Sequence, residues 1–198
     1  MIDRRSQILR AAHEIATTDG LSGVSVRHVA ARAGIGASTL RHYFPTQQDL
    51  FDAVLGTMLD AQLSDLRIKD ATVAPAIRLT ECVAQLLPAT DADVVRLEGW
   101  LAGYAAAIGP TRTEQQRAVL AALSRRARDR VGGWLAVLDA EDALRSPDLD
   151  QAAIILLAMV DGLALGLITP EGGATLERAR EALARVVEAA VVAPHSPG

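Results

Sequence analysis

Apolar residues recur along this chain every three or four positions, which is the spacing of amphipathic helices. Residues 4–18, for example, place Ile8, Ala12 and Ile15 on one face of a helix. Alternating apolar and polar runs bounded by turn residues, which would predict strands, are nearly absent. The pattern therefore predicts an all-α protein of about nine helices.

Glycine, proline and capping residues divide this pattern into separate helices. Gly34 follows a short helix that Ser25 can cap, and Pro45 ends the next one. Thr46 and Asp49 resemble a capping box at the start of a fourth helix. We expect helices over 4–18, 25–33, 37–44, 46–66, 75–87, 93–108, 111–138, 146–168 and 175–192.

The helix lengths suggest two domains. Three short helices occupy residues 1–47, and longer helices that form a bundle occupy residues 48–198. Thr111 and Glu114 fit a second capping box, at the start of the helix over 111–138. The first domain is therefore expected to carry a local motif, and the second a larger core.

The segment from Ser25 to Phe51 reads SVRHVAARAGIGASTLRHYFPTQQDLF. Its two short helices flank Gly34, and Val29 on the first is spaced to pack against Leu40 on the second. A short glycine-containing turn between steeply crossing helices is the arrangement of a helix-turn-helix. In that motif the second helix enters the major groove of DNA.

This segment resembles the DNA-binding domain of TetR-family transcriptional repressors. The resemblance rests on Val26–Ala30, Ala33–Gly36, Thr39–Phe44 and Leu50, and it covers about residues 5–55. The rest of the chain resembles the family in helix number, order and length. The resemblance implies a homodimer that represses transcription from a palindromic double-stranded operator and is released by a small-molecule effector.

The resemblance also implies a set of DNA contacts. Tyr43 corresponds to a phosphate-contacting position, whereas Leu40 and Phe44 are expected in the core. Gln47 stands where the family commonly has a phosphate-contacting lysine, and Arg41 is able to read a guanine in two hydrogen bonds. The predicted contacts are Arg27, Ala37, Ser38, Thr39, Arg41, His42, Tyr43 and Gln47. The alternative is a compact helical segment in which Arg27, Arg41 and His42 are ordinary solvated residues and Tyr43 belongs to the core.

The charge distribution favours an anionic partner at one end of the chain. The net charge is −4, but residues 1–50 carry six arginines and four acids, a balance of +2. The remaining 14 basic and 20 acidic residues leave −6 for the rest. A basic head on an acidic body suits DNA binding by the head alone.

The helix within 150–168 is apolar on nearly every side and contains AAIILLAMVDGLALGLI. A helix on the surface of a monomer needs a polar face. We therefore expect its outer face to be covered by a second copy of the chain. Together with the helix at 175–192, it would form a four-helix dimer interface, as the resemblance also implies.

The helices between Pro75 and Leu138 are expected to enclose an effector cavity. The helices of Pro75–Ile108 hold only two basic residues, Arg78 and Arg96, so the effector should be a mostly apolar small molecule with one or two polar groups and not a nucleotide or a sugar phosphate. The candidate lining residues are Leu86, Leu97, Trp100, Leu101, Tyr104, Ile108 and Trp134, with Gln85 and Glu98 as polar anchors. The alternative is that these residues fill an ordinary core.

Other chemistry finds little support in the sequence. Cys82 is the only cysteine, and the histidines do not have the spacing of metal ligands. No nucleophile or phosphate-binding motif is found, so neither an enzyme nor a metal or other cofactor is expected. The four histidines are His13, His28, His42 and His195. Two alternatives stay open: an activator or non-inducible regulator with the same head, and, less favoured, a helical enzyme.

Two further features concern the surroundings of the protein. No uncharged apolar run reaches the roughly 18–20 residues of a membrane span, so no membrane contact and a cytoplasmic location are expected. Arg125, Arg126, Arg128 and Arg130 form a basic cluster. We interpret it as a solvated helix face, and a second nucleic-acid contact is the alternative.

Overall fold

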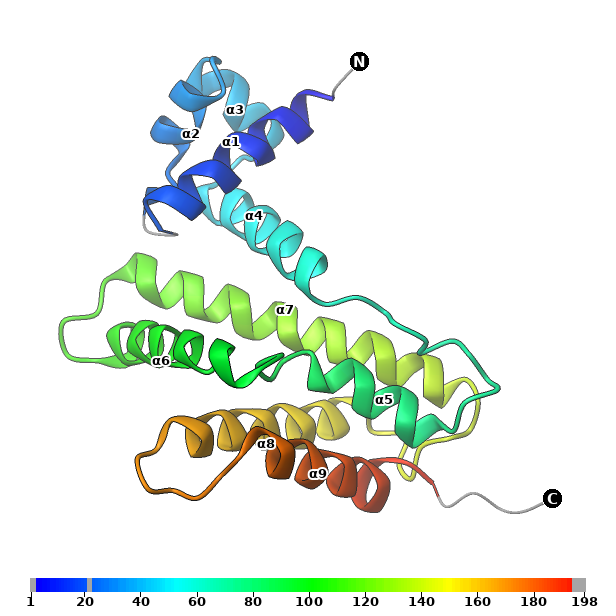
Figure 1. The fold of residues 1–198 in the computed structure, drawn as a ribbon. Coiled ribbons are helices and arrows are strands. Elements are labelled where there is room, and N and C mark those ends of the chain that lie inside the picture. The colour runs from blue at the N-terminus through cyan, green and yellow to red at the C-terminus, as the bar shows by residue number, and fades with distance from the viewer. Residues whose placement is uncertain (1–2, 21–22, 194–198) are drawn as a thin grey trace. The chain divides into compact units, whose positions relative to one another are not determined.

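The computed structural model describes residues 3–20 and 23–193, with the backbone alone over 58–62. Within these residues the chain is helical, and an isolated antiparallel bridge joins Leu144 to Val192 (Figure 1). The helices are α1 (Arg4–Thr18), α2 (Val26–Arg32), α3 (Ala37–Tyr43), α4 (Gln47–Gln62), α5 (Pro75–Ala84), α6 (Val95–Ile108), α7 (Glu114–Asp139), α8 (Leu149–Ile168) and α9 (Leu176–Val186). The all-α prediction is confirmed.

Two helix starts follow the predicted capping chemistry. Ser25 caps α2, because its hydroxyl accepts a hydrogen bond from the His28 N–H at 3.2 Å. Thr46 and Asp49 form the capping box: the Thr46 N–H donates to the Asp49 carboxylate (2.9 Å), and the Asp49 N–H donates to the Thr46 hydroxyl (3.0 Å). The Thr46 hydroxyl also donates to the Asp49 carboxylate at 2.7 Å, and this bond, followed by the one from the Thr46 N–H, lowers the pKa of Asp49.

Two predicted boundaries in the middle of the chain are wrong. The fourth helix ends at Gln62 instead of Leu66, and Leu66 adopts a left-handed conformation with φ 42° that a helix cannot contain. The capping box of α7 uses Thr113 and Gln116 instead of Thr111 and Glu114. The Thr113 N–H donates to the Gln116 side chain at 2.8 Å, and the Gln116 N–H donates to the Thr113 hydroxyl at 3.2 Å.

The last two helices are shorter than predicted. Helix α8 starts at Leu149 because the Asp148 carboxylate caps it, accepting from the Gln151 N–H at 2.9 Å. Helix α9 ends at Val186, where the chain continues as one π-helical turn over Val187–Val191. Both differences lie at the end of a helix, where sequence patterns predict the boundary least well.

The chain divides into two compact units. The first contains residues up to Ala61 together with Gly103–Arg126, and the second contains Gln62–Ala102 together with the chain from Ala127 onward. Helices α6 and α7 each contribute to both units. The functional boundary predicted after residue 47 stays a prediction, since units of contact need not coincide with units of function.

A single apolar core holds the first unit together. Helices α1, α2 and α3 pack around it, and the first half of α4 belongs to it as well. Val119 of α7 packs against the same core. Its most deeply buried members include Ile8, Ile15, Val29, Leu40, Phe44, Leu50, Phe51 and Val54. The DNA-binding motif is therefore rigidly joined to the start of α4.

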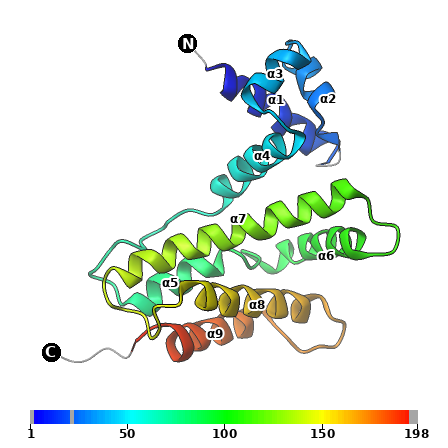
Figure 2. The ribbon, with the colours of Figure 1, turned by 180° about the vertical axis from the view of Figure 1, so that it is seen from behind.

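In the second unit α9 packs against both α5 and α8. Figures 1 and 2 show α8 and α9 side by side from opposite directions. Leu79, Val83, Leu156 and Leu183 have no exposed surface, so this contact is a tightly packed core. Helix α9 therefore covers the inward face of α8.

Candidate nucleic-acid interface and effector region

The α2–α3 hairpin separates its core residues from its candidate DNA contacts by burial. Val29 and Leu40 have no exposed surface, and Phe44 retains 2%. The expectation that Leu40 and Phe44 lie in the core is confirmed. All of the candidate contacts are exposed: Arg27, Ala37, Ser38, Thr39, Arg41, His42, Tyr43 and Gln47. Their contacts with DNA stay predictions.

The turn between α2 and α3 depends on Gly34. Its φ of 66° lies in the left-handed region, which a side chain disfavours. The Ile35 N–H then donates to the Ala30 carbonyl at 3.0 Å and closes the end of α2. This turn directs α3 away from α2 and so exposes one complete face of α3.

On that exposed face the rings of His42 and Tyr43 meet edge to face, with centroids 5.4 Å apart and planes at 84°. Mutual contact restricts the rotation of both side chains. The Tyr43 hydroxyl is therefore carried by a ring that is held on one side and open to solvent on the other, with 37% of the residue exposed.

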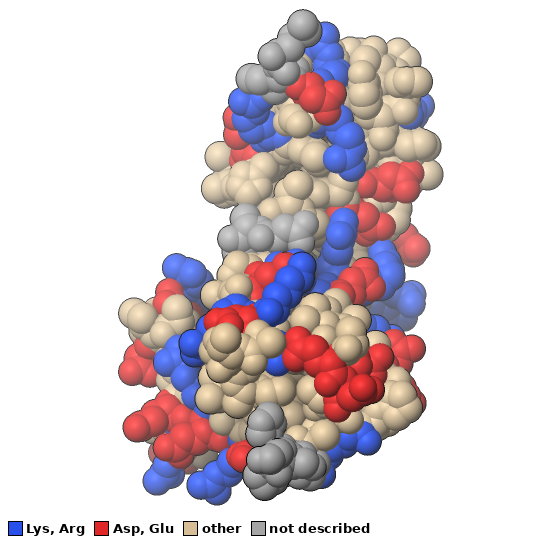
Figure 3. Space-filling model, turned by 90° about the vertical axis from the view of Figure 1, so that its right-hand side faces the viewer, with Lys and Arg blue, Asp and Glu red and all other residues tan. Residues whose placement is uncertain are grey.

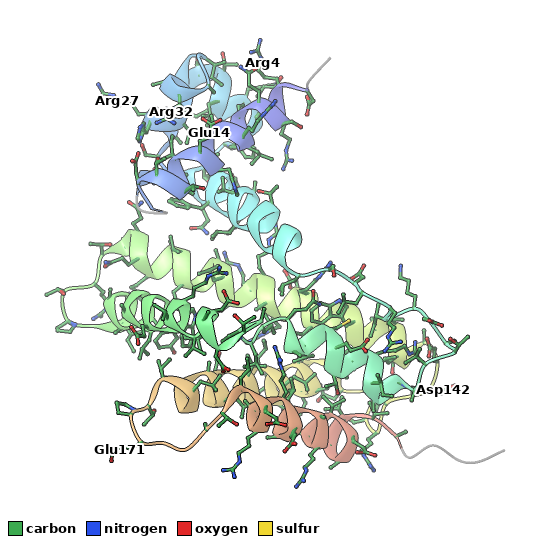
Figure 4. All side chains as sticks on the ribbon, viewed as in Figure 1. Arg4, Glu14, Arg27, Arg32, Asp142 and Glu171 are labelled. Carbon is green, nitrogen blue, oxygen red and sulfur yellow. The ribbon has the colours of Figure 1, made fainter. Side chains whose placement is uncertain are left out.

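The basic side chains of the head differ in how free they are. In Figure 4, Arg27 points away from the helices, whereas Arg32 lies near Glu14, 3.6 Å from its carboxylate. Figure 3 shows basic and acidic side chains interspersed on the face that it views. The net charge of residues 1–50 therefore indicates less about DNA binding than which of their arginines, such as Arg27, point away from the helices.

Two hollows with charged residues in their walls lie in or beside the region predicted to hold an effector. One of about 240 Å³ is bordered by Asp65, Ile68, Arg130 and Trp134 among others. A second of about 610 Å³ lies around residues 71–75 and 141–143. Of the predicted lining residues, Trp134 borders the first hollow, and the others border neither of these two.

The polar groups of two candidate residues are engaged by the chain itself. The Gln85 side chain accepts from the Ser64 N–H (2.9 Å) and donates to the Ser64 carbonyl (2.9 Å). The Trp134 indole N–H donates to Asp65 at 3.0 Å, and the ring is almost fully buried. An effector that used either group would have to replace these bonds. Glu98 is exposed, as is Tyr104, while Leu86, Leu97, Trp100 and Leu101 are half-buried and Ile108 is 58% exposed.

The one thiol and the histidines offer no reactive centre in the described residues. Burial raises the pKa of Cys82 to about 11, so the thiol is protonated and a poor nucleophile at neutral pH. Within residues 3–20 and 23–193 no three His, Cys, Asp or Glu side chains lie close enough to hold a metal ion. His195 lies outside the described residues.

Comparison with known protein families accounts for most of the chain. Residues 8–54 match the family described as "Bacterial regulatory proteins, tetR family". Residues 75–192 match "BetI-type transcriptional repressor, C-terminal". The chain belongs to the TetR family. It is a transcriptional regulator and not an enzyme, as predicted.

Individual relatives agree with this assignment. The TetR-family chain is 28% identical over 193 residues to the transcriptional regulator PksA of Bacillus subtilis, covering 96% of this chain and 90% of PksA. A choline complex of a regulator from Saccharomonospora viridis shares the fold, with a TM-score of 0.57 and 22% identity over 96% and 98% of the two chains. Thermus thermophilus FadR, bound to lauroyl-CoA, gives a TM-score of 0.58 and 18% identity over 98% of each chain.

One contact near the DNA-binding face of this TetR-family chain was not anticipated. The Arg5 guanidinium lies 5.3 Å from the centre of the Phe44 ring, a cation–π distance. The Gln7 side chain donates to the Ala33 carbonyl at 3.1 Å. The first turn of α1 is therefore joined to the turn of the motif at Ala33 and to the end of α3 at Phe44. An isolated arginine near a chain start carries no sequence signal for such stacking.

Proposed function

We propose that this TetR-family protein is a cytoplasmic, homodimeric repressor that binds a palindromic operator and leaves it when a small molecule binds. The observation that carries the proposal is that α3 exposes every side chain except Leu40, which has no exposed surface. That division is what a recognition helix needs, because its outer side chains must enter the major groove without loss of its own core.

Repression is supported by the family that residues 75–192 match, whose description names a transcriptional repressor. The relative KstR of Mycobacterium tuberculosis, 32% identical over 105 residues that make up 52% of this chain, is also named as a repressor. A bound repressor needs only to occupy its operator, so no surface for recruiting polymerase is required.

Dimerisation is supported by the outward face of α8. Ala152, Leu156 and Val160 point inward and are buried, whereas Ile154 and Leu165 are 46% and 41% exposed. Ala158 and Gly162 lie between these two on the exposed face. Apolar side chains in one stripe are expensive to leave in water, and a second copy would cover them.

Helix α8 is also long and apolar enough to span a membrane. Its most apolar window has a mean hydropathy of 2.1, and 28% of that window is buried within the chain. Among the described helices it alone does so. A dimer-forming helix passes the same test, because a partner's apolar face covers it as lipid would. Asp161, on this face, would be costly at the centre of a bilayer.

Effector binding is proposed for the region of α5, α6 and α7, with Glu98, Trp100, Leu101 and Tyr104 as contacts. Relatives of the same fold bind choline and lauroyl-CoA. We keep a mostly apolar small molecule as the proposed class, because Arg78 and Arg96 are the only basic residues of Pro75–Ile108 and Arg78 already binds Glu141.

The test is selection of binding sites from random double-stranded DNA, followed by sequencing. A two-fold symmetric site with half-sites about one helical turn apart is expected. Sedimentation of the protein with that site should give two chains per duplex. Recovery of no enriched sequence, or of a single asymmetric half-site bound by one chain, would contradict the proposal.

A further inference from the structure

The basic cluster on α7 fastens this helix to α4. Arg125 pairs with the Asp52 carboxylate at 3.1 Å, and Arg126 donates to the main-chain carbonyl of the same residue at 3.1 Å. The interpretation of the cluster as a solvated face is therefore wrong for Arg126 and for Arg130, which are both half-buried; Arg130 lies 3.3 Å from the Asp65 carboxylate. Arg128 is exposed, as that interpretation expected.

Gly56 makes room for the Arg126 guanidinium. A Cβ atom at Gly56 would lie only 2.7 Å from the Arg126 Cζ, closer than real side chains approach. Gly56 lies one turn beyond Asp52, whose carbonyl accepts the hydrogen bond from Arg126. The guanidinium thus lies flat against the surface of α4, in a notch that exists because position 56 has no side chain.

The notch lies directly behind the DNA-binding motif. Leu50, Phe51 and Val54 of α4 belong to the core that also contains Leu40 and Phe44. Val119, two turns before Arg126 on α7, packs against that core as well. The direction of α4 on α7 is therefore fixed by an apolar contact at Val119 and by the polar contacts that Arg125 and Arg126 make with Asp52.

The geometry points to Arg126, seated on Gly56, as a positioning residue that sets which operator spacing the dimer accepts. The inference rests on the proposed two-fold binding. Each recognition helix moves with α4 through the shared core, so the angle of α4 on α7 sets the separation of the two helices in a dimer. The contacts of Arg126 with Asp52 and Gly56 involve no candidate DNA-binding residue, so Arg126 should affect spacing without affecting base preference within a half-site.

Two variants should disrupt the contact between Arg126 and α4 in different ways. Arg126→Ala removes the guanidinium. Gly56→Ala leaves the guanidinium in the protein but fills its notch, and the displaced group is the flexible end of a side chain that can move aside. Alanine is also the better helix former, so Gly56→Ala should keep α4 folded. Arg128→Ala is the matched control, since it removes an exposed arginine from the same helix.

The measurement is the dissociation constant, at one salt concentration, for the selected operator and for operators with one or two base pairs added or removed at the centre. Each base pair moves a half-site by about 3.4 Å and rotates it by about 35°. The wild type should lose about tenfold or more in affinity on a two-base-pair change, and both variants about threefold or less. Arg128→Ala should keep the wild-type profile.

Substitutions within one half-site provide the second readout. The loss that each mismatch causes should be the same in the wild type and in both variants, because the recognition face is unchanged. Wild-type spacing profiles in Arg126→Ala and Gly56→Ala would overturn the inference alone. Loss of half-site preference together with spacing preference would overturn it too, in favour of a general support of the head. A wild type that selects no two-fold site would instead overturn the proposed function, and the inference with it.

Discussion

At the scale of single residues, the arginine with the least exposed surface lies far from the DNA-binding motif in sequence. Arg78 of α5 is 1% exposed and donates to the Glu141 carboxylate at 3.0 and 2.5 Å, and to the Ile68 carbonyl at 2.6 Å. The guanidinium holds the pKa of Glu141 below its usual value. A buried arginine is tolerated only when its charge is matched in this way.

Glu141→Gln should lower the free energy of unfolding by about 1–3 kcal/mol at neutral pH, because Arg78 stays buried without a counter-charge. The folded-state pKa of Glu141 lies below 4.5, its unfolded value, so the wild-type advantage is complete above pH 4.5. It should shrink as the pH falls through the lower folded-state pKa. Urea denaturation at several pH values measures this difference.

Asp142→Asn is the control for that experiment. It removes the neighbouring carboxylate, and asparagine accepts the left-handed conformation of this position, with φ 53°. The control should unfold almost as the wild type does. An equal loss of unfolding free energy in both variants at all pH values would mean that the Arg78–Glu141 ion pair contributes no more to stability than the Asp142 carboxylate does.

Tyr43 and Arg41 should differ in what their removal does to DNA binding. Tyr43→Ala should weaken binding to operator and unrelated DNA alike, because a phosphate contact carries no sequence information. Arg41→Ala should cost about 1–3 kcal/mol on the operator and relax the preference at one base pair of each half-site. Anisotropy titrations with the operator and its point variants distinguish the two. Wild-type binding by both variants would show that another face meets the DNA.

At the scale of elements, the sequence predicted what local chemistry decides. Ser25 and the Thr46–Asp49 pair cap helices because a side-chain oxygen three residues from an N–H group needs no tertiary support. Thr111 with Glu114 and Thr113 with Gln116 both have the spacing of a capping box, and only the path of the loop decides between them. The burial of Arg78 could not be predicted, since its partner lies 63 positions away.

Helix α8 gives the prediction at this scale. Leu165→Glu should break the dimer, because Leu165 is 41% exposed in the single chain and would carry a charge into an apolar interface. Gly162→Arg should do the same by bulk and charge. Sedimentation at micromolar concentration should give a dimer for the wild type and a monomer for both variants.

Leu66→Glu makes the same chemical change at a leucine that is 55% exposed and lies outside α8. It should leave the dimer intact. Wild-type sedimentation by Leu165→Glu and Gly162→Arg would place the interface elsewhere.

At the scale of the whole molecule, regulation requires that effector and operator prefer different geometries of the same dimer. A hundredfold loss of operator affinity needs about 2.7 kcal/mol of coupling between the two sites. The head and its junction with α4 could be predicted from a compact motif. The packing of the helices proposed to bind the effector could not, because no local pattern encodes contacts between separate helices. Trp100 is half-buried on α6, among the residues proposed to contact the effector.

Trp100 therefore gives the prediction that joins body and head. A thermal-shift screen of hydrophobic amines, fatty acids and antibiotics should find compounds that stabilise the fold, by about 2.7 kcal/mol at a concentration of 100 times the dissociation constant. The same compounds should release operator DNA. Trp100→Ala should abolish this release and leave effector-free DNA affinity nearly unchanged, because the residue lies outside the recognition face.

Val95→Ala is the matched control, since Val95 lies on the same helix and is 67% exposed. It should keep the full response, because trimming a side chain that contacts mostly water removes little binding energy from a buried ligand. Full release by a confirmed inducer from Trp100→Ala would place the effector elsewhere, and the 240 Å³ hollow beside Trp134 would be the next region to test. Hits confined to phosphorylated compounds would contradict the proposed effector class, because clustered basic groups would then have to gather around the ligand.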